Sequence, residues 1–435
     1  LFPEDYAQQI AAFSVRQVFW FILFLVLGTG ALAFVFSGAF SGRRSKLGGL
    51  LLGFVLIADL GRMDLPYIVH WDYEQKYQSN PIIDRLKVKP YEQRAIMSPL
   101  PGPPEMGLFA DVYRIEWSQQ LFTYNNILSL DIIQMPRRSE EYIAYESALS
   151  PHSPSLADLY LISRRWELTS SRYILGPTIT RLQLADAAGK PVLRDFGTLD
   201  FLNNDLDGGR GSFRVVTPFE IVPKPGITQV TQYEQLTAVE EPKGRYALYE
   251  FTGALPHAML FSHWQVSTND DATLKTLSSP EFLPHQTVLV SLPLPVAPAL
   301  DATNQNPGEV KFKSYKPADI VFEARAENNA VLMLNDKFDP IWRVTVDGKP
   351  AELLRCNYIM RGVFLTPGTH TVEFFFRPPL KPGYVTLAAM ALGILLSGLM
   401  IYSERRVASN EQSQRDATSK PFASGKSARG NFKSK

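Results

Sequence analysis

The chain has 435 residues, of which 45 % are hydrophobic and 20 % charged, and its formal net charge at pH 7 is +1. This composition is typical of a globular domain attached to apolar helices. The single cysteine, Cys356, excludes an internal disulfide and a zinc site built from thiolates. No glycine-rich phosphate loop, hydrolase elbow or nucleic-acid motif is present, so we expect no nucleic-acid partner.

Three strongly apolar segments bracket one long polar stretch: Val18–Phe40, Leu47–Leu60 and Tyr384–Tyr402. A bilayer core requires about 20 apolar residues in a helix. The first and third segments meet this requirement, and tyrosines at both ends of the third fit an aromatic belt. The second segment ends in charged residues, so it spans only if that end lies at the interface or packs against protein. The sequence predicts about three transmembrane helices.

Charge predicts the orientation of these helices. Arg43, Arg44 and Lys46 separate the first two segments, and eight basic but only three acidic residues follow Tyr402. The positive-inside rule places both the loop and the tail in the cytoplasm. The long middle stretch is then extracytoplasmic, and its lack of disulfides suits a bacterial inner-membrane protein. Because the chain begins with Leu1, we interpret it as a fragment without its upstream helices, with a processed protein as the alternative.

Residues 1–65 thus form two transmembrane helices with a basic cytoplasmic loop, at the end of a polytopic core. Residues 66–300 read as an extracytoplasmic mixed α/β domain. Its predicted helices cover residues 72–86 (kinked or divided at Pro81), 139–149, 155–166 and 270–278. Strands are expected from about Tyr173 onward, at 213–222, 228–239, 245–251 and 288–292. Residues 189–211 look loop-rich and are expected to be an exposed insertion, and 293–308 look like a linker.

From Glu309 the apolar residues alternate with period two, which predicts about six short strands and a β-sandwich over 309–380. Asp347-Gly348 between two strand-like runs indicates a tight hairpin. A C-terminal transmembrane helix over 383–403 and a disordered basic cytoplasmic tail over 404–435 complete the predicted fold. The expected fold class is therefore a membrane protein with an α+β module and a C-terminal β-sandwich outside the cytoplasm.

The end of the outer region contains a series of elements in a fixed order: Asp336, Pro340 and Trp342; Val346 to Lys349; Arg361; and Pro367, Gly368, His370 and Val372. This series resembles the C-terminal signature of the YfhO family of bacterial membrane proteins. Ile341 stands where many members have glycine, and the last element is one residue shorter here. The resemblance extends from about Leu47 to Gly383.

This resemblance implies a relation to GT-C glycosyltransferases, which take sugars from a lipid-phosphate carrier, usually a polyprenyl phosphate. Their catalytic carboxylate is expected in a first outer loop, which this chain does not contain, so no catalytic residue is assigned. The sequence also assigns no cofactor and no metal ligand. The implied partners are the lipid bilayer, a lipid-linked sugar and an envelope polysaccharide or glycan acceptor.

Asp59, Arg62 and Asp64 at the end of the second apolar segment are the first candidates for substrate contact. At the outer membrane face they suit a lipid-phosphate headgroup or a metal ion. The alternative is an interfacial helix end in which Asp59 and Arg62 pair at i, i+3.

Asp336, Asp339 and Trp342 are the second group of candidates. Carboxylates accept hydrogen bonds from sugar hydroxyls, and an indole face stacks on a sugar ring, so a sugar platform is one interpretation. The favoured alternative places Trp342 in the core, because it shares the parity of Val344 in its strand, and gives Asp336 a role in a turn.

The sequence thus predicts the C-terminal portion of an integral-membrane glycosyltransferase, in which this part supports acceptor binding or the shape of the site. The alternative is a non-enzymatic envelope protein whose β-sandwich binds polysaccharide or a partner protein.

Overall fold

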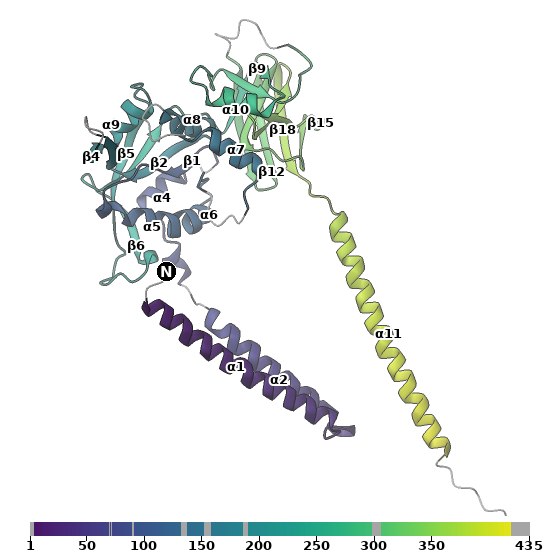
Figure 1. Ribbon diagram of the computed structural model, residues 1–435. Coiled ribbons are helices and arrows are strands. Elements are labelled where there is room, and N and C mark those ends of the chain that lie inside the picture. The colour runs from purple at the N-terminus through teal and green to yellow at the C-terminus, as the bar shows by residue number, and fades with distance from the viewer. Residues whose placement is uncertain are drawn as a thin grey trace, which may run out of the picture. The chain divides into compact units, whose positions relative to one another are not determined.

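A helical hairpin dominates the first of the two units into which the chain divides, Leu1–Gln78 (Figure 1). In this computed structural model, α1 (Glu4–Phe36) and α2 (Ser45–Asp64) pack side by side. The reversal between them uses Gly38 and Gly42, whose φ angles of 82° and 64° suit glycine. The short helix α3 (Tyr73–Lys76) ends this unit.

The structure describes residues 4–418 except 69, 71, 89–90, 132–136, 152–157, 186–189 and 298–305. Within these residues two helices are long and apolar enough to cross a membrane, Ala7–Phe36 and Lys381–Val407. By length and composition, a helix of this kind near the N-terminus is typical of a membrane anchor or a signal sequence. The second predicted span is the helix α2, but it does not reach the same apolarity, because its last two turns carry charged side chains.

The C-terminal helix is longer than predicted. The helix α11 runs from Lys381 to Thr418, so the first part of the tail expected to be disordered continues the helix. Residues 419–435 of that tail lie outside the described residues.

The second unit, Ser79–Lys435, begins with a sheet whose strand order is β1-β2-β7-β5-β6. Its strands are β1 (Arg94–Met97), β2 (Ser171–Pro177), β7 (Tyr246–Phe251), β5 (Phe213–Pro223) and β6 (Leu236–Glu240). Only β1 and β2 pair in parallel. The predicted strands at 213–222 and 245–251 are confirmed, whereas β1 was not expected and the strand predicted over 228–239 is limited to β6.

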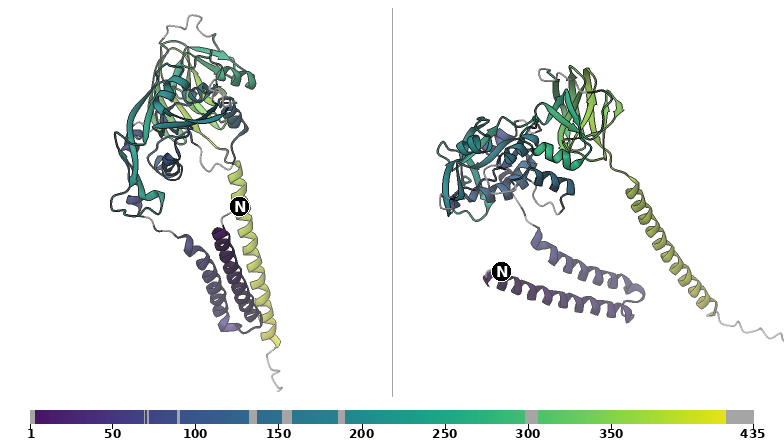
Figure 2. Two further views of the ribbon diagram at one scale, coloured as in Figure 1. Left: turned by 60° about the vertical axis from the view of Figure 1, so that its left-hand side comes forward. Right: turned by 45° about the horizontal axis from the view of Figure 1, so that its top comes forward.

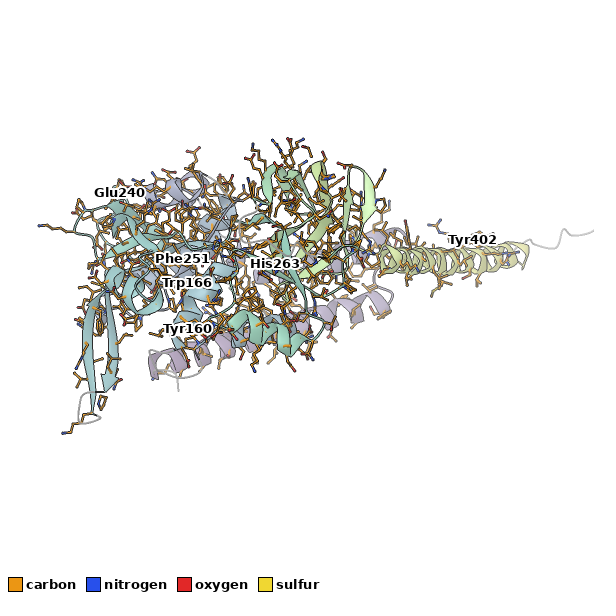
Figure 3. All side chains as sticks on the ribbon, turned by 90° about the horizontal axis from the view of Figure 1, so that it is seen from above. Tyr160, Trp166, Glu240, Phe251, His263 and Tyr402 are labelled. Atoms are coloured by element: carbon orange, nitrogen blue, oxygen red, sulfur yellow. The ribbon has the colours of Figure 1, made fainter. Side chains whose placement is uncertain are left out.

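Both faces of this sheet are covered, and every residue of its central strand β7 is buried. On one face α8 (Tyr160–Leu168) contributes Trp166, which shares a core with Phe251 of β7 (both labelled in Figure 3). Trp166 packs edge-on to Phe213, and Phe213 stacks on Phe251. Other large aromatic residues from α5 (Leu108–Val112) and the π-helical segment η4 (Tyr113–Leu121) pack against Phe219 and Tyr246. This double coverage explains why apolar residues occupy both faces of β7; its one charged residue, Glu250, is paired with Arg172 and Arg214.

The expected exposed insertion over 189–211 is wrong in part. Strand β4 (Pro191–Gly197) pairs with β3 (Ile179–Ala185) in a hairpin that is largely exposed. The residues that follow form α9 (Thr198–Phe201) and a π-helical turn (Leu202–Leu206), whose apolar side chains are buried in the core with Trp166. Hydrophobic side chains spaced along this helical segment outweigh its many turn-forming residues.

Two further sheets form the predicted sandwich (Figure 2). One has the order β11-β12-β18-β14-β15: β11 (Gly308–Lys316), β12 (Asp319–Ala326), β18 (Gly368–Phe376), β14 (Trp342–Val346) and β15 (Lys349–Ala351). The other has the order β8-β13-β17-β16-β10-β9: β8 (Ala258–Phe261), β13 (Ala330–Lys337), β17 (Met360–Leu365), β16 (Leu354–Cys356), β10 (Thr287–Val290) and β9 (His263–Val266). Buried residues of both sheets share one core.

The sandwich therefore extends beyond the predicted 309–380. Strands β8, β9 and β10 come from before the proline-rich segment, and β8 pairs with β13 from after it. A boundary near residue 300 would leave β13 without one neighbour, so the sandwich needs chain from both sides of that segment. The Asp347-Gly348 hairpin is confirmed, with Val346 opposite Lys349 and positive φ angles at both turn residues.

Helices cover the outer face of the six-stranded sheet (Figure 1). Tyr145 of α7 (Glu140–Ala148) and Leu277 of α10 (Asp270–Ser278) are buried against its strands. Both helices were predicted, and their starts are capped by the side chains of Ser139 and Asn269. The helix predicted over 72–86 is divided before Pro81, because Asn80 caps a new helix, α4 (Pro81–Leu86). The helix predicted over 155–166 starts later, at Tyr160, and 155–157 lie outside the described residues.

Candidate functional site

The α1–α2 hairpin contains a groove of about 610 Å³ that brings two of the predicted site residues together, Asp59 and Arg62. Its other lining residues are mostly apolar: Phe13, Gln17, Phe21, Phe24, Leu25, Met63 and Tyr67. The groove is thus mostly apolar, and its charged residues are Asp59 and Arg62. Asp64, the third candidate of this group, ends α2, is exposed, and does not line the groove.

Arg62 has few partners in this groove. Both of its terminal nitrogens lie 3.4 Å from Gln17 Oε1, and its guanidinium lies 4.9 Å from the centre of the Trp20 ring. Its Nε is buried without a hydrogen-bond partner in the described part of the chain. The predicted pair between Asp59 and Arg62 is not among the ion pairs of the described residues, because the guanidinium turns toward α1. Arg62 is left with weak hydrogen bonds and one aromatic face.

Asp336 lies at the end of β13, where three sheets meet. Its Oδ1 accepts hydrogen bonds from Arg94 Nη2 at 3.0 Å and His257 Nε2 at 2.9 Å. Its Oδ2 accepts from Arg361 Nη2 at 2.9 Å and Tyr315 OH at 3.1 Å. Arg94 belongs to β1, Arg361 to β17 and Tyr315 to β11, so one carboxylate joins strands of three sheets. The expected turn role of Asp336 is wrong.

Two of the side chains that donate to Asp336 make further contacts of their own, His257 with the Tyr91 carbonyl and Arg361 with the Trp342 ring. His257 Nδ1 lies 2.6 Å from the Tyr91 carbonyl oxygen, so the ring is held at both nitrogens. The Arg361 guanidinium lies 3.7 Å from the centre of the Trp342 ring. Burial raises the pKa of Asp336, but His257, Arg94 and Arg361 outweigh burial and hold that pKa well below its ordinary value.

The other two candidates of this group are structural. Trp342 is 9 % exposed and belongs to the core between the two sandwich sheets, as its strand parity predicts. Asp339 makes a turn: its Oδ1 accepts from the Ile341 backbone at 2.8 Å, and its carbonyl accepts from the Trp342 backbone at 3.1 Å. The structure does not assemble Asp336, Asp339 and Trp342 into an open sugar platform.

A second carboxylate, Asp131, was not singled out by the sequence. It lines a cleft of about 570 Å³ whose walls come from β1, η4, α7 and α8. Its Oδ2 accepts hydrogen bonds from Tyr113 OH at 2.5 Å and from the Met97 backbone at 2.9 Å. Burial raises the pKa of Asp131 above its ordinary value, against the effect of these hydrogen bonds and of Arg165 and Arg114. No local motif surrounds Asp131, so only the fold reveals this cleft.

Among the residues that the structure describes, no three His, Cys, Asp or Glu side chains gather into a group suited to a metal ion. Comparison with protein-family models, with curated proteins and with solved structures found no match.

Proposed function

We propose that this chain is the membrane-anchored C-terminal part of a glycosyltransferase similar to the YfhO family, which uses a lipid-phosphate sugar donor, and that this part supports acceptor binding or the shape of the site. Three helices cross a bacterial inner membrane in this proposal, with residues 66–380 outside the cytoplasm. Apolar helices at both flanks of the folded region support the arrangement. The basic residues between α1 and α2 fit a cytoplasmic loop.

The observation that carries the proposal is the position of Arg62 at the ionic end of an apolar groove. A guanidinium in apolar surroundings costs free energy unless its donors are satisfied. The buried Nε of Arg62 has no partner among the described residues, and its other contacts are weak. Phosphate oxygens match a guanidinium in charge and geometry. A lipid phosphate would place its headgroup on Arg62 and its hydrocarbon chain along Phe21 and Phe24.

Lipid binding by the full chain in nanodiscs tests this contact. Retention of a polyprenyl phosphate, measured by native mass spectrometry, should fall at least tenfold in Arg62→Ala, about the loss of one charge-assisted hydrogen bond. Arg62→Lys should retain part of the binding. Arg16→Ala is the matched control, because Arg16 is an exposed arginine of α1 outside the groove. Equal losses in Arg62→Ala and Arg16→Ala would contradict a specific contact.

Orientation is testable with the chain's own cysteine left in place, because Cys356 is fully buried and burial raises the pKa of its thiol. A membrane-impermeant maleimide added to intact spheroplasts should label Asp205→Cys and spare Ser45→Cys. Both positions are exposed. Labelling of Ser45→Cys alone would reverse the proposed orientation.

The alternative function, a non-enzymatic envelope protein that binds a glycan, is favoured by the Asp131 cleft, which offers a binding geometry without any lipid. Transfer from a lipid-linked sugar by the complete protein distinguishes the two functions. Deletion of 309–377 is a poor test, because it removes strands from both sandwich sheets. Single substitutions at the groove and the cleft are therefore the sharper variants.

A further inference from the structure

The Asp131 cleft is lined by charged side chains of both signs. Arg114, Arg138 and Arg165 supply three guanidinium groups, and Asp131 and Glu146 supply two carboxylates. Glu146 pairs with Arg138 and, at 3.3 Å, with Arg165. Within the described chain Arg114 has no ion pair. The cleft therefore has one excess positive charge and one arginine open to an anionic ligand.

Some hydrogen-bonding capacity in the cleft is also unused. Both hydrogen bonds to the Asp131 carboxylate go to Oδ2, so Oδ1 has no hydrogen-bond partner among the described residues. The buried Nε of Arg165 likewise lacks a partner in the part of the chain that is described. A ligand with hydroxyl groups could donate to Asp131 while its anionic group faces the arginines.

Most of the remaining lining is apolar or aromatic. The half-buried Tyr142 lines the cleft together with Ile96, Met97 and Leu130, and the cleft adjoins a smaller cavity of about 110 Å³ lined by Tyr145, Ile359 and Met360 among others. An aromatic face suits the C–H face of a sugar ring. The volume of the main cleft lies within the range of about 300–1,000 Å³ usual for small-ligand sites.

We infer that the Asp131 cleft binds an acidic saccharide, with the sugar hydroxyls on Asp131 and Glu146, the ring on Tyr142, and a carboxylate or phosphate substituent on Arg114 and Arg165. An acidic peptide fits less well, because its side chains would meet two carboxylates without hydroxyls to donate to them. The inference deepens the acceptor-binding part of the proposed function. It depends on residues other than Arg62, so loss of the lipid contact would leave it intact.

Titration of the full chain in detergent micelles with defined probes tests the inference. The probes are glucuronate, glucose 1-phosphate, glucose, inorganic phosphate and a glutamate hexapeptide, with binding followed by saturation-transfer NMR and calorimetry. We expect glucuronate or glucose 1-phosphate to bind at least tenfold more tightly than glucose and than phosphate alone. Equal binding of phosphate alone would reduce the cleft to an anion site, preferential binding of the peptide would reassign its ligand, and no binding of any sugar would overturn the inference.

Substitutions locate the binding. Arg114→Gln removes an exposed guanidinium that has no structural partner in the described residues, so folding should be preserved while the Kd for the acidic sugar rises at least tenfold and that for glucose changes little. Arg138→Gln is a second variant, with an expected rise of a few-fold because Glu146 retains Arg165. Arg194→Gln, at an exposed arginine of the β3–β4 hairpin, is the matched control. An Arg114→Gln protein that binds as the Arg194→Gln protein does would place the ligand elsewhere.

Discussion

Two partly buried carboxylates of the second unit have opposite environments. Among the described residues Asp336 accepts four hydrogen bonds, two of them from arginines, whereas Asp131 accepts two, from a hydroxyl and a backbone amide. The pKa of Asp336 is accordingly lowered and that of Asp131 raised, although burial acts in the same direction on both. The number of cationic side chains that contact each carboxylate decides whether its pKa is lowered or raised.

This difference separates a structural ion network from a candidate binding site. Asp336 has no remaining capacity for a ligand, and its partners lie on strands of three sheets, so it fixes those sheets to one another. In the described part of the chain, one oxygen of Asp131 has no hydrogen-bond partner. The arginines of its cleft form no ion pair with Asp131 there, so they remain able to attract an anionic ligand. A strongly shifted pKa therefore indicates a functional site only where the group also has hydrogen-bonding capacity that the protein leaves unused.

Asp336→Asn should have the largest effect on stability. It leaves the buried Arg361 and the partly buried Arg94 without their counterion, a loss expected to cost about 3–5 kcal/mol. Thermal unfolding of the full chain in detergent, followed by near-UV circular dichroism, measures this cost. Asp205→Asn, at an exposed aspartate, is the control and should unfold like the unsubstituted protein. A similar stability for both variants would show that Asp336 does not hold the sheets together.

The effect of Asp336→Asn should depend on pH. Because the folded-state pKa of Asp336 is lowered, its stabilising contribution is present above the unfolded pKa of about 3.9 and is lost as pH falls toward the folded value. The difference between the variant and the unsubstituted protein should then shrink below about pH 4. A difference that is constant from pH 7 to pH 3 would contradict the ion network.

Local features of this fold were predictable from the sequence, and the ion network was not. The hairpin at Asp347-Gly348, the capped helix α10 and the inward side of Trp342 depend on residues within one or two turns or one strand. Arg94 and Asp336, by contrast, are 242 residues apart, so no local pattern relates them. Strand pairings between β8 and β13 and between β1 and β2 are equally non-local.

The candidate site follows the same rule. Asp59 and Arg62 could be singled out because they end an apolar segment, which is visible in a short window of sequence, and the hairpin brings both into one groove with residues of α1. The predicted i, i+3 pair failed because Gln17 and Trp20 of the neighbouring helix compete for the guanidinium. Asp131 acquires its environment from four separate elements, and nothing in its neighbourhood along the chain indicates them.

Tyr113→Phe tests the weaker environment of Asp131. The variant removes one of the two hydrogen bonds to a buried carboxylate, and bonds to charged groups contribute about 1.5–3 kcal/mol. Because Tyr113 lowers the pKa of Asp131, its loss should raise that pKa further, and the stability loss should be larger at pH 7 than near pH 4. Tyr233→Phe, at a part-exposed tyrosine that donates to Asp111, is the control, with little expected change. Equal unfolding midpoints for the two variants would remove Tyr113 from the site.

Asp131→Asn should have the smallest effect on the free energy of unfolding. The sign of this effect should be opposite to that of Asp336→Asn. A folded-state pKa above the unfolded value means that ionisation of Asp131 opposes folding, so its unfavourable contribution appears as pH rises through the unfolded pKa toward the folded value. Asparagine keeps an acceptor for Tyr113 and Met97 but does not ionise, so the variant should gain stability relative to the unsubstituted protein as pH rises from 4 to 7, by about 1 kcal/mol or less. Asp336→Asn should show the opposite slope over the acid range. The measurement is the free energy of unfolding of each variant at a series of pH values. If both variants changed with pH in the same direction, cationic side chains would compensate the charge of Asp131 as fully as that of Asp336. The cleft would then lack the unused binding capacity on which the proposed ligand depends.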